Sequence, residues 1–184
     1  MNLNAKEYIK ADMFRYYGKN KISIMEKIKY TPEQKYIILL RKTQFEKNHI
    51  KKLYYKIMLR HKKNKTQIQI PDSAKIGKGL YLGHLGTIVI NPNVEIGCNV
   101  NIATGVTIGQ TNRGDKQGTP IIGNRVWIGT NSVIVGKIKI GNNVLIAPNS
   151  YVNFDVPNDS IVIGNPGKIY HKVNACDKYI ENTI

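Results

Sequence analysis

Aliphatic residues recur every six positions from about residue 68 to residue 169, and this spacing dominates the apolar and polar pattern of the chain. In the second half the repeating positions are Ile122, Ile128, Ile134, Ile140, Ile146 and Val152. In the first half they are Ile70, Ile76, Leu82 and Ile88 and, after a slip of two residues in IVINPNVE, Ile96, Ile102 and Ile108. A period of six fits neither an α-helix nor a hairpin array, and it is typical of parallel β-helices. Each six-residue unit is expected to form one flat side of a triangular coil, with its aliphatic residue pointing inward.

The repeat is interrupted once, between Ile108 and Ile122, by the segment TNRGDKQGTP. Since six residues would be enough to connect two inward positions, about eight are extruded as a loop. We place this loop at residues 111–119. Loops that leave a rigid scaffold commonly carry specificity.

The first third of the chain shows helical patterns instead. Residues 4–17 form an expected helix that stops at Gly18, and Thr31 begins a second one as its N-cap. Pro32 suits the first helical position and Gln34 completes a capping box, so the helix should run to about residue 60 with an interruption near Asn48. The segment HKKNK at 61–65 is interpreted as a polar linker.

Three parts follow from these patterns: a basic helical region at 1–66, a β-helix at 67–172 with its loop at 111–119, and a tail at 173–184. Pro157 and Pro166 are expected to halt the stacking of coils, and the tail is expected to be irregular or weakly helical. The fold class is therefore mainly β, with a short α-helical N-terminal domain.

Positive charge is concentrated in the helical region. The formal net charge is +16, and residues 1–66 carry 18 Lys and Arg against 5 Asp and Glu. Such a field attracts anionic membrane surfaces or acidic polymers, and the alternative is a set of solvated helix faces. Nucleic acid is not the expected partner, because the aromatic residues of this region are spaced for helix packing. With no signal peptide or apolar run of membrane-spanning length, a cytoplasmic location is expected, with peripheral contact at the inner membrane face as an addition.

His84 is the candidate for chemistry within the repeat. It occupies a solvent-facing position two residues after the inward Leu82. An imidazole ordinarily titrates near pH ~6.5, which makes an exposed histidine on a rigid edge a suitable general base. One histidine in the coil cannot build a three-histidine zinc site, so no metal is expected. The two cysteines, Cys98 and Cys176, suggest no disulfide framework.

These residues carry a family resemblance. The segment SAKIGKGLYLGHLGTIVINPNVEIGCNVNIATGVTIG and the closing segment VPNDSIVIGNPGK resemble the hexapeptide-repeat acyltransferases, and within them the serine acetyltransferase-like branch. That resemblance implies a left-handed parallel β-helix, a homotrimer with sites between neighbouring coils, and acetyl-CoA as the cosubstrate. It also gives His84 the role of the catalytic histidine, which takes the proton of an acceptor hydroxyl.

For the remaining site residues the resemblance gives expectations of two kinds. The expected acetyl-CoA residues are Gly129, Thr130, Ala147, Pro148, Asn153 and Lys168. The expected acceptor-side residues are Gln69, Asn101 and Thr119. Gln69 stands where serine acetyltransferases carry an aspartate that orients the histidine, and Thr119 stands where they carry a second histidine. Gly118 replaces a basic residue beside it.

These departures favour a saccharide hydroxyl over a zwitterionic amino acid. The expected function is O-acetylation of a capsule, exopolysaccharide or O-antigen unit, which can be anionic or lipid-linked. Acetylation of L-serine or of an amino sugar is the first alternative. A non-catalytic basic binding or scaffold protein is the alternative of another class.

Overall fold

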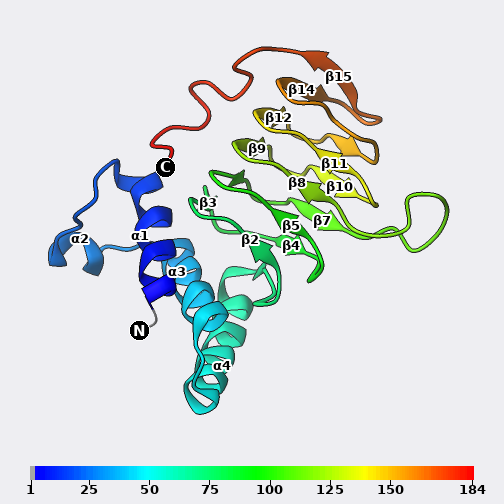
Figure 1. Ribbon diagram of the computed structural model, residues 1–184. Coiled ribbons are helices and arrows are strands. Elements are labelled where there is room, and N and C mark those ends of the chain that lie inside the picture. The colour runs from blue at the N-terminus through cyan, green and yellow to red at the C-terminus, as the bar shows by residue number, and fades with distance from the viewer. Residues whose placement is uncertain (1–2) are drawn as a thin grey trace.

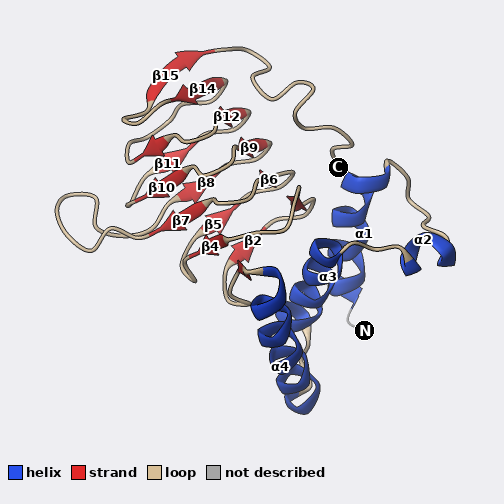
Figure 2. Cartoon of the chain, turned by 180° about the vertical axis from the view of Figure 1, so that it is seen from behind, coloured by secondary structure: helices blue, strands red, loops and turns tan. Residues whose placement is uncertain are grey.

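The computed structural model describes residues 3–184, and residues 68–171 in it form a parallel β-helix with three sheets (Figures 1 and 2). Sheet A contains β1 (Ile68–Gln69), β4 (Ile88–Ile90), β7 (Thr107–Gly109), β10 (Val133–Val135) and β13 (Tyr151–Val152). Sheet B contains β2 (Lys75–Ile76), β5 (Glu95–Ile96), β8 (Ile121–Ile122) and β11 (Lys139–Ile140). Sheet C contains β3 (Tyr81–Leu82), β6 (Asn101–Ile102), β9 (Val126–Ile128), β12 (Val144–Ile146), β14 (Ser160–Ile163) and β15 (Lys168–His171). The chain visits A, B and C in turn, so each circuit is one coil.

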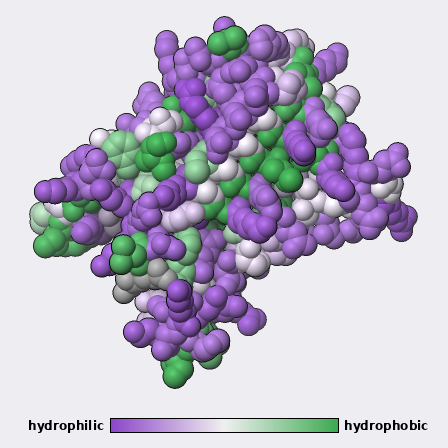
Figure 3. Space-filling model, in the orientation of Figure 1, coloured by the Kyte–Doolittle hydropathy of each residue, from purple (hydrophilic) through white to green (hydrophobic). Residues whose placement is uncertain are grey.

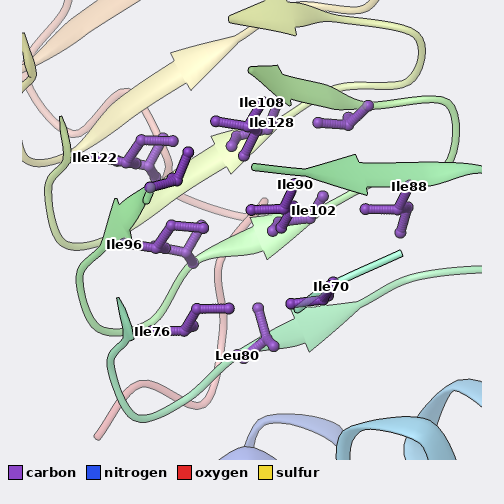
Figure 4. Packing of buried hydrophobic residues seen from close by; sticks show 14 of the residues in the cluster. Ile70, Ile76, Leu80, Ile88, Ile90, Ile96, Ile102, Ile108, Ile122 and Ile128 are labelled. Atoms are coloured by element: carbon purple, nitrogen blue, oxygen red, sulfur yellow. The ribbon is translucent and has the colours of Figure 1, made fainter. Parts of the chain in front are cut away.

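The aliphatic repeat fills the interior of the coil, as predicted. The side chains at the repeating positions are at most 6% exposed, and Figure 4 shows Ile76, Ile96 and Ile122 stacked above one another. Burying one such side chain contributes about 1.5–3 kcal/mol. Because every coil contributes residues in the same register, the core is continuous from the first coil to the last.

Glycine follows the aliphatic residue at one corner because the coils approach too closely there for a side chain. A Cβ atom on Gly97 would lie 2.6 Å from the carbonyl oxygen of Gly123, and one on Gly77 would lie equally close to that of Gly97. Real Cβ atoms do not come so near to backbone. The glycines of the repeat therefore set the spacing between coils.

Within the described residues, four helices precede the coil: α1 (Leu3–Tyr17), α2 (Ile24–Ile28), α3 (Pro32–Phe45) and α4 (His49–Thr66). The stop at Gly18 is confirmed by its positive φ of 64°, and the capping box is confirmed by a bond from Thr31 N to Gln34 Oε1 of 3.0 Å. The break between α3 and α4 falls next to Asn48, which caps α4.

Two expectations about the helices are wrong. Residues 61–65 are not a linker, because α4 continues through them to Thr66 and ends with Gln67 in the left-handed conformation. Lysine is a good helix former, and no Gly or Pro interrupts the segment. The short helix α2 was missed, although Ser23 and Glu26 form its capping box.

A buried ion pair fixes the helices to the first coil. Arg41 of α3 contacts Asp12 of α1 at 2.8 Å, and both side chains are fully buried. Arg41 Nη1 also donates to the carbonyl of Ile76 at 2.8 Å, and the amide of Leu80 donates to Asp12 Oδ1 at 2.8 Å. Desolvation by burial raises the pKa of the Asp12 carboxyl, against the attraction of Arg41. The four groups hold α1, α3 and the coil together as one unit.

The coil continues past Pro157, contrary to expectation. Val156 forms a bridge to β11, and β14 then pairs in parallel with β12. Pro157 therefore lies at a corner, and the chain completes the last circuit after it. At Pro166 the chain does turn back, and β15 pairs antiparallel with β14.

The tail, residues 173–184, is irregular as predicted and returns toward α1 (Figure 1). Although most of its residues are polar, the tail packs against the coil through three buried side chains, Ala175, Cys176 and Ile180. Both cysteines are free. None of the helices within residues 3–184 combines the length and apolarity that crossing a bilayer would require.

Candidate active site

His84 lies on the corner of the coil where sheet C passes to sheet A. The register of sheet C pairs Leu82 with Ile102, Ile102 with Ile128, Ile128 with Ile146 and Ile146 with Val162. The residues two positions further on therefore form a column along this corner, which consists of His84, Thr104, Thr130, Pro148 and Gly164. The exposed histidine is thus the first member of a column that runs the length of the coil.

A pocket of about 480 Å³ opens beside His84. Its walls come from three parts of the chain: α1, sheet C with its corner, and the tail. The residues that matter most are Arg15, Tyr16, Asn101, Trp127, Thr130 and Tyr179. The side chain of His84 is exposed, as predicted, while Leu82 before it is fully buried.

Tyr16 of α1 fixes the strand that presents His84. The amide of Leu82 donates to the Tyr16 hydroxyl at 2.9 Å, and the hydroxyl donates to the Leu82 carbonyl at 2.9 Å. The ring of Tyr16 stacks on that of Tyr81, with 4.4 Å between centroids. Burial raises the pKa of Tyr16, so the hydroxyl stays protonated. His84 is therefore held on a short strand that is tied to a helix.

Arg15 forms the charged wall of the pocket, and each of its three nitrogens already donates one hydrogen bond. It donates from Nη1 to the Gly79 carbonyl at 2.8 Å, from Nη2 to Asn101 Oδ1 at 2.7 Å and from Nε to the Glu181 carbonyl at 2.9 Å. Burial lowers the pKa of Arg15 to about 10, so the guanidinium remains charged at neutral pH. Asn101 in turn donates to the Tyr179 carbonyl at 3.0 Å. Asn101, one of the expected acceptor-side residues, thus lines the pocket with its amide engaged on both sides.

A second hollow, of about 940 Å³, continues the pocket along sheet C. Trp127, Lys178 and Tyr179 line both spaces, and the rings of Trp127 and Tyr179 lie 4.9 Å apart. The rest of the second hollow is mainly apolar, with walls from Leu145, Ala147, Pro148, Ile161 and Ile163. The two hollows form one groove, which the tail covers from outside.

The expected cosubstrate residues divide between two corners. Thr130 lines the His84 pocket, and Ala147 and Pro148 line the second hollow. Lys168 pairs with Ile163 at the far end of the same corner. Asn153 instead follows β13, on the corner between sheets A and B, where its carbonyl accepts a bond from Lys116 at 2.8 Å. A single chain therefore does not bring Asn153 to the groove.

Gly129 is required by packing. A Cβ atom there would lie 2.6 Å from the nitrogen of Pro148 and 2.8 Å from the ring of Trp127. The close approach of two coils is therefore enough to explain why residue 129 is glycine. A role of Gly129 in binding acetyl-CoA does not follow from this glycine.

Two of the expected acceptor-side residues lie away from the His84 pocket of their own chain. Gln69 is on β1 in sheet A and is absent from the pocket wall. Thr119 ends the extruded loop, where its hydroxyl donates to the Asn93 carbonyl at 3.1 Å. The loop itself is closed by paired bonds between Thr111 and Gly118, and it projects on the opposite side of the coil from the tail (Figures 1 and 2).

Sequence reasoning missed the contribution of α1 and of the tail to the pocket. The spacing of the aromatic residues in the first third indicates helix packing, and it gives no sign that the Tyr16 hydroxyl also bonds to the backbone of Leu82. Tyr179 and Glu181 belong to a segment that lacks any periodicity, so only the folded chain shows that they line the same pocket as His84.

The fold and the repeat define the class of protein. A family model described as bacterial transferase hexapeptide (six repeats) matches residues 119–153. The structure is similar to soybean serine acetyltransferase, with a TM-score of 0.76 and 26% identity over 92% of this chain and 70% of the soybean chain. The predicted fold class, a left-handed parallel β-helix with a short helical N-terminal region, is confirmed by this similarity. The chain therefore has the left-handed β-helix fold, and residues 119–153 resemble the hexapeptide repeats of bacterial transferases.

The particular relatives are serine acetyltransferases. That of Helicobacter pylori (strain ATCC 700392 / 26695) is 38% identical over 107 residues, which cover 58% of this chain and 63% of the relative. That of Staphylococcus aureus (strain N315) is 43% identical over 104 residues, which cover 56% of this chain and 49% of the relative. The chain thus spans between about half and under two thirds of the length of these curated relatives.

Two further solved structures carry ligands in their names. The serine acetyltransferase of Brucella abortus strain S19 in complex with coenzyme A gives a TM-score of 0.78 at 26% identity, over 94% of this chain and 70% of that one. The Neisseria gonorrhoeae serine acetyltransferase in complex with serine gives 0.75 at 28% identity, over 91% and 69%.

Proposed function

We propose that this protein is an acetyl-CoA-dependent O-acetyltransferase in which His84 is the general base. The observation that supports it best is the position of His84, which is exposed on a rigid corner at one end of a groove. The relatives that share this fold are named serine acetyltransferases, and one of them binds coenzyme A.

The reaction follows from the chemistry of an imidazole beside a hydroxyl group. A neutral His84 accepts the proton of the acceptor hydroxyl while the oxygen attacks the thioester carbonyl carbon. The carbon–sulfur bond then breaks, and the imidazolium returns its proton to the leaving thiolate. General-base catalysis of this kind contributes about 10²–10⁴-fold, and fixed positioning contributes more.

The groove suits the cosubstrate. A pantetheine arm is narrow and largely apolar, which matches the second hollow with Ala147, Pro148 and Trp127 in its walls. Lys168 at the far end of the same corner supplies a cation for a phosphate group. The thioester would then reach the pocket between Thr130 and His84.

For the acceptor, L-serine takes first place over the saccharide expected from sequence, because the relatives are named for serine. The pocket wall also contains charged residues of both signs, Lys178 and Glu181, which are the kinds of group that a zwitterion needs. A saccharide hydroxyl remains the second candidate. The volume of about 480 Å³ accommodates a sugar ring. By the family resemblance, Gln69 also stands in place of a charged aspartate, and Thr119 in place of a histidine.

A homotrimer is part of the proposal. Thr119 and Asn153 lie on corners away from the groove of their own chain, whereas a neighbouring coil could bring them to it. Closed cyclic symmetry would make three equivalent sites.

The test is thiol release from acetyl-CoA with L-serine and, separately, with free, nucleotide-linked and polymeric saccharides. Turnover with serine at a kcat/KM at least ~10-fold above any saccharide supports the first candidate, and the reverse order supports the second. Absence of turnover with every acceptor, from a folded trimeric protein, would remove the enzymatic proposal.

A further inference from the structure

Helix α4 exposes an apolar stripe to solvent. Ile50, Leu53, Tyr54 and Ile57 are 82%, 60%, 58% and 60% exposed. Their spacing of three, four and seven residues from Ile50 places them on one helical face. The opposite face is buried, with Leu59 and Thr66 packed toward the rest of the protein. Figure 3 shows apolar surface at the lower tip of the helical region, where α4 lies.

The stripe is bordered by positive charge on both sides. The sequence of α4, HIKKLYYKIMLRHKKNKT, holds seven Lys and Arg residues and no Asp or Glu. At 100° per residue, Lys51 and Lys62 fall on one side of the stripe and Lys56 and Arg60 on the other. Within residues 3–184 the ion pair found on this helix joins Lys56 to Asp72 at 3.5 Å, so most of the charge lies without an acidic partner.

This combination identifies the kind of partner. An apolar stripe between two rows of lysine and arginine is the pattern of helices that lie in the plane of a membrane surface. A second copy of the chain is a poor occupant, because symmetric pairing of two α4 helices would bring seven positive charges against seven. A purely polyanionic partner would use the lysines and leave the stripe in water.

We propose that α4 docks this protein on the surface of an anionic lipid bilayer. The stripe would enter the boundary between headgroups and acyl chains, and the flanking lysines would extend their alkyl chains to reach the lipid phosphates. Clusters of lysine and arginine on an amphipathic helix bind acidic lipids in this way, and salt weakens the attraction.

Helix α2 offers a second apolar point in the same half of the molecule. Ile24, Met25 and Ile28 are 77%, 68% and 70% exposed, and Lys27 lies among them. Figure 3 shows apolar surface over α2 at the outer edge of the helical region, away from the last coils. Neither α2 nor α4 contributes a residue to the walls of the groove beside His84. The proposal stands whether or not the protein is an acetyltransferase, because it concerns surface chemistry alone.

The experiment is co-sedimentation of the full chain with large vesicles, without either substrate. Vesicles of phosphatidylglycerol and phosphatidylcholine at 3:7 are compared with vesicles of phosphatidylcholine alone. We expect binding to the first and at least ~10-fold weaker binding to the second, with loss in 0.5 M salt. The double variant Leu53→Ser/Ile57→Ser should bind the anionic vesicles at least ~10-fold more weakly. It removes apolar area that would be buried in the bilayer, and it removes no charge.

A matched control removes two exposed apolar residues at the opposite end of the molecule. The variant Ile169→Ser/Tyr170→Ser changes side chains that are 39% and 53% exposed on β15 and should bind like the original chain. If Leu53→Ser/Ile57→Ser does not fold, by circular dichroism, Ile50→Ser replaces it, because that side chain is 82% exposed.

Several results would overturn the proposal. Equal vesicle binding by the chain and the stripe variant would reduce the interaction to charge alone. Tighter binding to duplex DNA than to anionic vesicles, unchanged in the variant, would favour a nucleic acid. Self-association that the variant abolishes, with no vesicle binding, would assign the stripe to a second copy.

Discussion

The Tyr16 hydroxyl exchanges two hydrogen bonds of 2.9 Å with the backbone of Leu82, two residues before His84. The same arrangement recurs once more in the first coil. Tyr36 of α3 accepts a bond from the Ile70 amide at 3.1 Å and donates to its carbonyl at 3.2 Å. Two helices thus hold two strands by the same chemistry, and only one of these strands presents the histidine.

This pair gives a prediction with an internal control. Tyr16→Phe removes the hydroxyl that positions the His84 strand, and we expect kcat to fall about 10-fold with little change in KM. Tyr36→Phe removes an equivalent pair of bonds far from the pocket and should leave kcat within about twofold. Both variants should lose about 1–3 kcal/mol of stability in denaturant unfolding. Equal kcat losses in the two variants would assign the effect to stability alone.

His84→Gln should reduce acetyl transfer at least ~100-fold, because glutamine cannot take the proton. The melting temperature should stay unchanged, since the side chain is exposed. His171→Gln on β15 is the matched control, also exposed, and should retain full turnover. Near-normal rates in His84→Gln would exclude it as the base.

Tyr179→Ala tests the tail as a wall of the groove. The variant opens both hollows, and we expect KM for acetyl-CoA and for the acceptor to rise about 10-fold while kcat changes less. Tyr170→Ala, on β15 and outside both hollows, should leave both constants unchanged. Unchanged KM values in Tyr179→Ala would show that substrates do not use the covered groove.

The buried hydroxyl of Tyr36 should make the free energy of unfolding fall at high pH. Burial raises the pKa of Tyr36 from 10.0 to about 12. The folded state therefore keeps a proton that the unfolded state loses first. The contribution is complete below pH 10 and is lost as pH rises from 10 to about 12, by on the order of 2–3 kcal/mol. Tyr36→Phe should show a flatter fall in unfolding free energy over this window. Parallel curves for the two proteins would contradict the assignment.

Subunit mixing tests whether the site is shared. If the loop at 111–119 serves the groove of a neighbouring chain, His84→Gln and a variant with residues 112–117 replaced by Gly-Gly should each be inactive alone. Mixed trimers should recover up to about a quarter of the activity, because half of the sites receive an intact histidine and half of those an intact loop. Light scattering should report three chains. No recovery from mixed trimers would place the complete site within one chain.

The coil could be predicted because its repeat is local and regular: each aliphatic residue that the period selects is buried, and His84 follows from the same register. The site could be predicted only in part, because its walls depend on contacts between distant segments. Arg15 meets Glu181 across 166 positions, and no local pattern encodes that contact. The prediction of a linker at 61–65 failed for a simpler reason. A run of lysines is polar whether it forms a helix or a loop, so polarity alone does not distinguish the two.

The tail has a consequence for how the protein unfolds. Stacked repeats contact only their neighbours, so such arrays can fray from either end. Here the segment that leaves the last strand returns to the second coil, where the Ile184 backbone exchanges bonds of 3.0 and 3.1 Å with Asn99. The Asn182 side chain also donates to the Arg15 carbonyl on α1. The tail thereby connects the last coil to the second coil and to α1 through hydrogen bonds. We therefore expect the coils to unfold together in one cooperative transition, without fraying first from either end.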